Sequence, residues 1–212
     1  YYPIIETDEH GFNNPKGLYK ENKVDIVLIG DSYAEGYSVH SNESISAVLR
    51  QYDFNTISIG KSGNGPLIEL AALKEYAEPL KPKIVLWLYY INDFFDLRIE
   101  MQSSFLRKYL NEDDYSQNLM SRQEEIDGVL INYVQKEWKK RRVERNRLQR
   151  HPVIKIAKLY NLRKKINAIP SYTPISTHTP TPIFRNILQK SNQMVSDWDG
   201  KMYFVYLPAL KR

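Results

Sequence analysis

The chain has 212 residues, 42% of them hydrophobic, so it can bury one sizeable core but is too short for two full domains. It lacks cysteine, which excludes a disulfide framework, a thiolate metal site and a cysteine nucleophile. The net charge of +5 is uneven, because basic side chains crowd the stretch from Lys136 to Arg150. That stretch predicts a solvated helix face, with contact to an anionic surface as the alternative. Nucleic acid is not an expected partner, since Trp138 is the one aromatic residue among these charges.

The N-terminal residues, from Tyr1 to Glu6, contain neither an initiator methionine nor the basic-then-apolar pattern of a signal peptide. We therefore expect the natural chain to begin upstream of Tyr1. Localisation stays open, and an upstream segment would allow an extracytoplasmic or membrane-associated protein. No apolar run in the sequence approaches the roughly 18 residues that a membrane-spanning helix needs.

The N-terminal half of the chain alternates between strand and helix patterns. Three apolar runs predict buried strands, namely Val24 to Ile29, Asn55 to Ile59 and Lys83 to Tyr90. Between them, apolar residues recur at helical spacing from Ile45 to Tyr52, after the capping residues Ser41 to Ser44, and again from Pro66 to Tyr76. This alternation predicts an α/β protein with a doubly wound parallel sheet, whose functional loops lie at the carboxyl ends of the strands.

The C-terminal half predicts one more strand, from Met202 to Leu207. About 110 residues separate it from the third strand, more than a crossover requires. We therefore expect residues 98–200 to be a helical insertion or cap within a single domain that covers residues 1–212. Helices are predicted around Ile126 to Val134 and after Pro152, and the segment from Pro170 to Pro182, with four prolines, predicts a loop or hinge.

A candidate nucleophile follows the first strand directly, in Gly30-Asp31-Ser32. A nucleophilic hydroxyl needs a rigid edge, and the end of a buried strand entering a tight turn supplies one, with backbone N–H groups nearby for a developing oxyanion. The same three residues are also ordinary turn residues after any strand. Ser32 is therefore interpreted together with the ends of the other two strands.

Those two strand ends supply candidate hydrogen-bond donors. Gly63 follows the second strand and would let the backbone approach a substrate closely and donate its N–H. Asn92, in Asn92-Asp93, follows the third strand and could point its amide at the same oxygen. One strand end carries a nucleophile and the other two carry hydrogen-bond donors, and this combination predicts acyl transfer. Each loop taken alone would indicate only a turn.

These residues resemble the SGNH/GDSL hydrolase family, which is named for Ser, Gly, Asn and His at such positions. Ser32, Gly63 and Asn92 match the first three, and the resemblance covers roughly Asp8 to Leu97 together with Tyr203 to Pro208. It implies a flavodoxin-like three-layer α/β/α sandwich with a central parallel sheet. It also implies that Ser32 attacks an ester carbonyl while the Ser32 and Gly63 N–H groups and the Asn92 amide hold the oxyanion.

This sequence differs from the family pattern in two places. The family usually has a glycine shortly before the Asn-Asp pair, where this chain has Tyr90-Ile91. The family also places an Asp-x-x-His block after the last strand, and this chain stops at Arg212 before any such block. We therefore expect a C-terminally incomplete domain, inactive by itself, whose general base lies beyond Arg212. The sequence contains four histidines that do not match the block, namely His10, His40, His151 and His178.

The predicted function is therefore a serine ester hydrolase that acts on an acylated small molecule or on O-acyl groups of a carbohydrate, as similar bacterial proteins do. Asp31 and Asp93 have supporting roles, with Asp31 bracing the turn before Ser32. No cofactor or metal is expected, since Asp31, Asp93 and Asp96 lack accompanying His or Glu residues at ligand spacing. An O-acyltransferase of the same fold and a non-catalytic binding module remain alternatives, and oligomeric state is left open.

Overall fold

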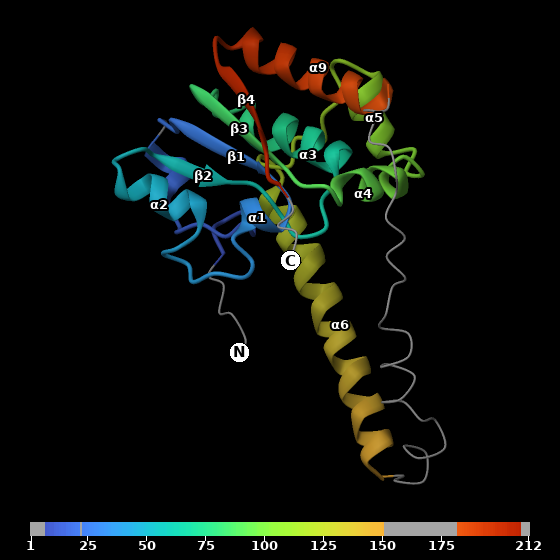
Figure 1. Ribbon diagram of the computed structural model, residues 1–212. Coiled ribbons are helices and arrows are strands. Elements are labelled where there is room, and N and C mark those ends of the chain that lie inside the picture. Colours follow the sequence, from blue (N-terminus) through green and yellow to red (C-terminus); the bar gives the residue numbers. More distant parts are fainter. Residues whose placement is uncertain (1–6, 22, 151–181, 209–212) are drawn as a thin grey trace. The chain divides into compact units, whose positions relative to one another are not determined.

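The computed structural model describes residues 7–21, 23–150 and 182–208 (Figure 1). Within this part of the chain, four strands form one sheet in the order β2-β1-β3-β4, and every pair is parallel. The strands are β1 (Ile26–Gly30), β2 (Thr56–Ser58), β3 (Ile84–Tyr89) and β4 (Lys201–Tyr206). The predicted α/β architecture with a parallel sheet is confirmed, and each strand lies within two residues of its predicted bounds.

Helices flank the sheet and connect its strands. The described helices are η1 (Leu18–Glu21), α1 (Ser32–Glu35), α2 (Ile45–Gln51), α3 (Pro66–Ala72), η2 (Leu73–Ala77), α4 (Asp93–Glu100), α5 (Leu106–Asn111), α6 (Gln123–Arg150) and α9 (Pro182–Asp197). The α2 helix begins as predicted, because the hydroxyl of Ser44 caps it by accepting the N–H of Ala47 at 3.2 Å. The predicted helix after Pro66 continues beyond α3 as the π-helical turn η2.

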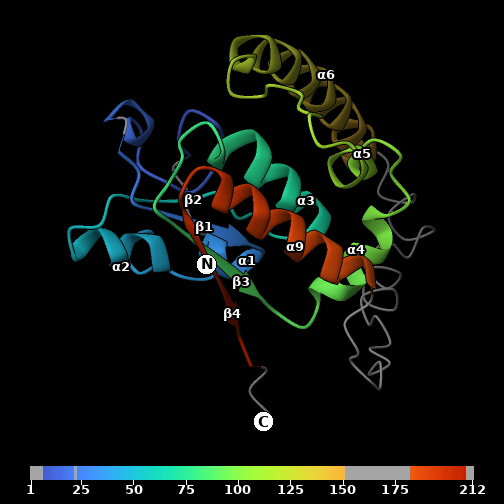
Figure 2. The same cartoon turned by 90° about the horizontal axis from the view of Figure 1, so that it is seen from above.

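The core lies on both faces of the sheet. Successive residues of β1 point to opposite faces, so Val27 and Ile29 pack in the larger cluster while Leu28 packs in the smaller one. The larger cluster includes residues of α3 and α9, and the smaller one includes residues of α1 and α2. Figures 1 and 2 show these two helix pairs on opposite sides of the sheet. This arrangement leaves the carboxyl ends of β1 and β3 side by side, with Gly30 opposite Leu88.

The N-terminal segment covers one edge of the sheet. The side-chain amide of Asn14 donates to the carbonyl of Ser58 at 2.8 Å and accepts the N–H of Ser58 at 2.9 Å. A side chain thus takes the place of a neighbouring strand along β2, which satisfies backbone groups that an open edge would expose. The same segment reaches α1, since Asn13 donates to the carbonyl of Glu35.

The chain divides into two compact units, Tyr1–Ser121 with Pro180–Arg212, and Arg122–Thr179. The first unit holds the sheet together with α4, α5 and α9, so the two ends of the expected 98–200 insertion belong with the sheet. Helix α9 buries Phe184, Ile187 and Val195 in the larger core cluster. The predicted helix after Pro152 and the predicted loop before Pro182 lie outside the described residues.

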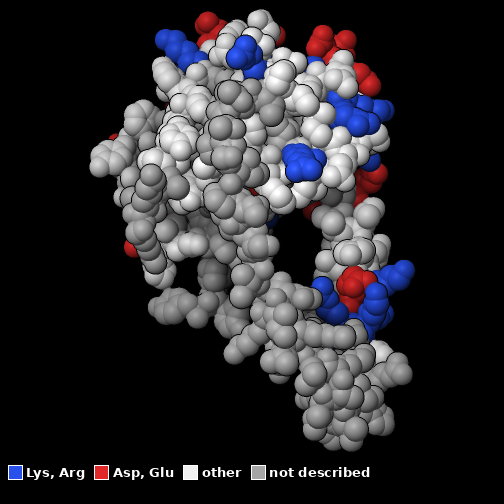
Figure 3. All heavy atoms as spheres, turned by 45° about the vertical axis from the view of Figure 1, so that its right-hand side comes forward, with Lys and Arg blue, Asp and Glu red and all other residues white. Residues whose placement is uncertain are grey.

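In the second unit the structure describes α6. The predicted apolar stripe falls on this helix, but Val129, Tyr133 and Val134 are exposed rather than buried. Exposed Lys and Arg side chains follow along the helix beside acidic ones (Figure 3). Among the helices that the structure describes, none is both long and apolar enough to cross a membrane.

Candidate functional site

The predicted nucleophile begins a helix. Strand β1 ends at Gly30, and Asp31 then caps α1 by accepting the N–H of Tyr33 at 3.0 Å with its Oδ1 atom. The hydroxyl of Ser32 lies 3.4 Å from the other oxygen, Asp31 Oδ2, which is a long contact. Asp31 is buried, whereas Ser32 is only half-buried. The turn therefore places the Ser32 hydroxyl near the carboxylate of the preceding residue.

The predicted amide donor lies at the same carboxylate. Asn92 precedes α4, and its Nδ2 atom donates to Asp31 Oδ2 at 3.3 Å and to Asp96 Oδ2 at 3.2 Å. Because β1 and β3 pair in parallel, residues that follow their carboxyl ends meet at one edge of the sheet. The structure thus brings together Ser32, Asp31 and Asn92. Both hydrogens of the Asn92 amide point to carboxylates in this arrangement.

The third predicted residue, Gly63, lies in the loop that follows β2. Its φ of +87° is in the region that favours glycine. A Cβ atom on Gly63 would meet nothing within 4 Å, so this part of the loop borders open space. The loop is tied to the end of β1 through Lys61, whose N–H donates to the carbonyl of Gly30 at 3.2 Å.

Two backbone donors of the predicted oxyanion hole are unused. Within the described residues, neither the N–H of Ser32 nor that of Gly63 donates a hydrogen bond. Most polar backbone groups of a folded protein find partners, so unengaged N–H groups beside a strand end are available to a ligand.

The described histidines have their contacts elsewhere. The ring of His10 packs against that of Tyr19 with 4.6 Å between centroids, and the backbone N–H of His40 donates to Glu43 on the exposed surface. His151 and His178 lie outside the described residues. A general base for Ser32 is therefore not identified in the described part of the chain.

Sequence reasoning missed a group of buried carboxyl groups behind the strand ends. Glu69 of α3 is 1% exposed and Asp93 of α4 is fully buried. Among the residues that the structure describes, both oxygens of Glu69 and Oδ1 of Asp93 have no hydrogen-bond partner, while Asp93 Oδ2 accepts the N–H of Tyr90. One local signal existed, because Glu69 lies at helical spacing between Pro66 and Leu73, on the face that α3 buries.

The protonation of these carboxyl groups follows from their burial. Burial, together with the nearby charge of Asp93, raises the pKa of Glu69 well above its usual range. The indole N–H of Trp87 acts to lower that pKa, but it does not reach hydrogen-bonding geometry. Burial also raises the pKa of Asp93 to about 8, although the N–H of Tyr90 acts in the opposite direction.

In the residues described, no group of three or more acidic or histidine side chains is arranged to hold a metal ion.

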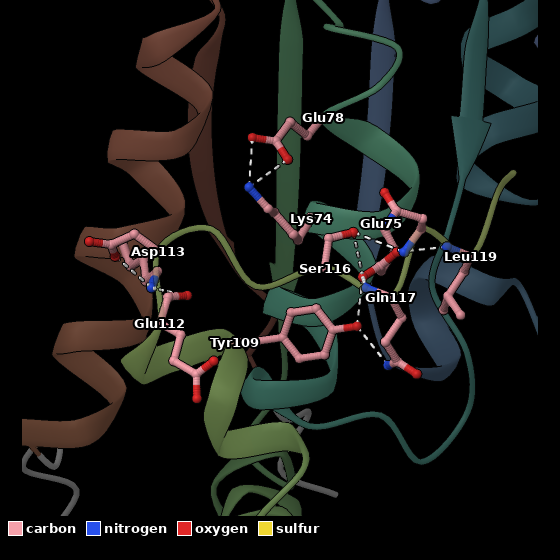
Figure 4. Close-up of polar contacts among 11 residues, drawn as sticks. Lys74, Glu75, Glu78, Tyr109, Glu112, Asp113, Ser116, Gln117 and Leu119 are labelled. Atoms are coloured by element: carbon pink, nitrogen blue, oxygen red, sulfur yellow. Dashed lines mark hydrogen bonds and ion pairs between the residues drawn. The ribbon is translucent and has the colours of Figure 1, made fainter.

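A second polar region lies around Glu75, in the π-helical turn η2 (Figure 4). The buried carboxylate of Glu75 accepts the hydroxyl of Tyr109 at 2.7 Å, the hydroxyl of Ser116 at 3.0 Å and the N–H of Leu119 at 2.8 Å. A neighbouring cavity of about 460 Å³ is lined by residues of η2 and of the segment from Asp114 to Ser121. None of the predicted site residues lines it, and Glu75 serves to order the chain that follows α5.

No protein-family model matches this chain, and neither a curated protein nor a solved structure matches it.

Proposed function

We propose that the protein is a serine ester hydrolase of the SGNH/GDSL type. The observation that carries this proposal is the meeting of Ser32 and Asn92 at one carboxylate, Asp31, beside the carboxyl ends of the paired strands β1 and β3. The strand order β2-β1-β3-β4 also supports it, because flavodoxin-like sheets begin with this order and bind their ligands at the same edge.

In the proposed reaction, the Ser32 hydroxyl attacks the carbonyl carbon of an ester, and its proton passes to a general base. The unengaged N–H groups of Ser32 and Gly63 stabilise the negative charge that develops on the carbonyl oxygen. Asn92 contributes its amide once one of its two carboxylate contacts is exchanged for that oxygen. The alcohol leaves with the proton, and water then hydrolyses the acyl-enzyme.

The proposed substrate is an acylated small molecule or an O-acylated carbohydrate. If a sugar hydroxyl takes the place of water in the second step, the same site is that of an O-acyltransferase. Both reactions require the acyl-enzyme on Ser32, so both are lost when the Ser32 hydroxyl is removed.

A non-catalytic carbohydrate- or partner-binding module is the second candidate. The observation that favours it is the Asn92 amide, whose two hydrogens already meet the carboxylates of Asp31 and Asp96. A module of this kind would bind an acylated oligosaccharide equally well with and without the Ser32 hydroxyl and would not cleave it.

The decisive test uses protein expressed from its complete gene, with p-nitrophenyl acetate as the substrate. Ser32→Ala should abolish hydrolysis, because it removes the attacking oxygen. Ser38→Ala is the matched control, since Ser38 is an exposed serine that follows the C-terminal end of α1 and should leave the rate unchanged. Equal rates for the wild type and Ser32→Ala would contradict the proposal.

A further inference from the structure

The glycine-rich loop from Gly60 to Gly65 is held at its first half by a buried carboxylate. Glu35, the last residue of α1, is 2% exposed. It accepts the ammonium group of Lys61 at 2.6 Å and the N–H of Ser62 at 2.8 Å, and it also accepts the hydroxyl of Ser62. Three donors from two adjacent loop residues therefore converge on one side chain.

A second buried carboxylate holds the other half of the loop. Glu100, the last residue of α4, is 6% exposed and accepts the N–H of Gly65 at 2.6 Å and the N–H of Leu67 at 2.9 Å. Helix α3 has no capping side chain of its own, so Glu100 satisfies its first N–H groups from a distant part of the sequence. A Cβ on Gly65 would lie 2.8 Å from Glu100 Oε2, and only glycine allows this approach.

Burying two carboxylates is unfavourable unless hydrogen bonds compensate. For Glu35, burial acts to raise the pKa, but the hydrogen bonds from Lys61 and Ser62 outweigh it and leave the pKa below its usual range. For Glu100, burial raises the pKa although the N–H groups of Gly65 and Leu67 act against it. A buried carboxylate is weak evidence for stability, so the contacts of Glu35 and Glu100 call for another role.

The two helices connect these carboxylates to the proposed catalytic residues. Helix α1 begins with Ser32 and ends with Glu35, and α4 follows Asn92 and ends with Glu100. Gly63 lies between the two held halves of the loop, in the segment where an added Cβ would meet no atom. Both halves of the loop are therefore fixed to the helix that begins with the nucleophile and to the helix that follows the amide donor.

We propose that Glu35 and Glu100 are positioning residues that clamp the loop and so fix the N–H of Gly63 relative to Ser32 and Asn92. This inference rests on the proposed ester hydrolase function, because it assigns the clamp to the oxyanion hole of that site. Both carboxylates are buried and bonded to the loop, so each is assigned an action through the loop. Loss of either contact should therefore lower kcat and leave KM nearly unchanged.

The test compares the wild type with Glu100→Gln, Glu100→Ala and Glu35→Gln in protein from the complete gene. Glutamine keeps one acceptor oxygen and alanine keeps none, so kcat for p-nitrophenyl acetate should fall about tenfold in Glu100→Gln and further in Glu100→Ala. KM should stay within about twofold. Glu124→Gln is the matched control, because Glu124 is exposed on α6 and should leave kcat unchanged.

Amide hydrogen exchange supplies a second readout that needs no activity. Residues 60–67 should exchange faster in the Glu35 and Glu100 variants, in the same rank order as the loss of kcat, while β1 and β3 keep their protection. Unchanged exchange in the loop, or unchanged kcat in an enzyme that depends on Ser32, would overturn the clamp. If Ser32→Ala hydrolyses the ester as fast as the wild type, the proposed function fails, and the exchange measurement alone decides whether Glu35 and Glu100 hold the loop.

Discussion

The amide nitrogen of Asn92 lies 3.3 Å from Oδ2 of Asp31, the oxygen that also faces the Ser32 hydroxyl at 3.4 Å. Asp31 therefore has two tasks, since its Oδ1 atom caps α1 while its Oδ2 atom links two strand ends. The sequence predicted only the first task, as a brace for the turn. Asp31 is therefore the residue that both Ser32 and Asn92 contact, through the same carboxylate oxygen.

Asp31→Asn separates these two tasks. Asparagine caps helices as well as aspartate does, so the variant should fold with a stability loss of less than about 1 kcal/mol. Its new NH₂ group would face the donors of Ser32 and Asn92, and kcat for p-nitrophenyl acetate should fall about 10- to 100-fold. Steady-state kinetics and thermal unfolding measure the two effects.

Asp114→Asn is the control, because Asp114 is exposed, and it should change neither kcat nor stability. An unaltered kcat in Asp31→Asn would show that the acceptor shared by Ser32 and Asn92 is irrelevant to the reaction.

Asn92→Ala removes the proposed amide donor. Loss of one oxyanion-hole donor costs roughly 3 to 4 kcal/mol of transition-state stabilisation, so kcat should fall about 100- to 1,000-fold. Because Asn92 contacts the oxyanion only in the transition state, KM should change little. Asn111→Ala is the control, since Asn111 is exposed at the end of α5. A variant at Asn92 with wild-type kinetics would show that the Asn92 amide does not stabilise the oxyanion.

The strands could be predicted because each is a short apolar run whose burial needs no knowledge of its partners, as in β1 and β3. The α2 helix could be predicted because its cap, Ser44, lies next to it in the sequence and needs no distant partner. The clamp could not, since Glu100 and Gly65 are far apart in sequence and nothing local pairs a carboxylate with a distant N–H. Helix α9 was missed as an individual element, although Phe184, Ile187 and Val195 lie at helical spacing on its buried face.

The stability of the fold should depend on pH through Asp93. Burial raises the pKa of Asp93 to about 8 in the folded protein, against about 4 for an unperturbed aspartate. The folded state therefore holds a proton that the unfolded state has released, and stability should fall as the pH rises from about 4 to about 8. Urea unfolding at pH 5 and pH 8 measures this loss. Asp93→Asn removes the titration but keeps an acceptor for the N–H of Tyr90, so its stability should fall less over the same range. Identical pH profiles for both proteins would mean that Asp93 ionises normally.

Glu69 offers the sharpest test of the buried carboxyl groups, because both of its oxygens lack a hydrogen-bond partner among the described residues. A buried polar group without hydrogen bonds costs more than an apolar side chain of similar size. Glu69→Met should therefore raise the free energy of unfolding by about 1 to 2 kcal/mol at pH 8, where ionisation of the buried carboxyl group is most unfavourable. The gain should shrink at pH 5, because the raised pKa of Glu69 favours its neutral form as the pH falls. The exposed counterpart Glu124→Met should stay within about 0.5 kcal/mol of the wild type at both pH values. A destabilised Glu69→Met variant with Glu124→Met unaffected would contradict this expectation and show that the carboxyl group of Glu69 stabilises the fold.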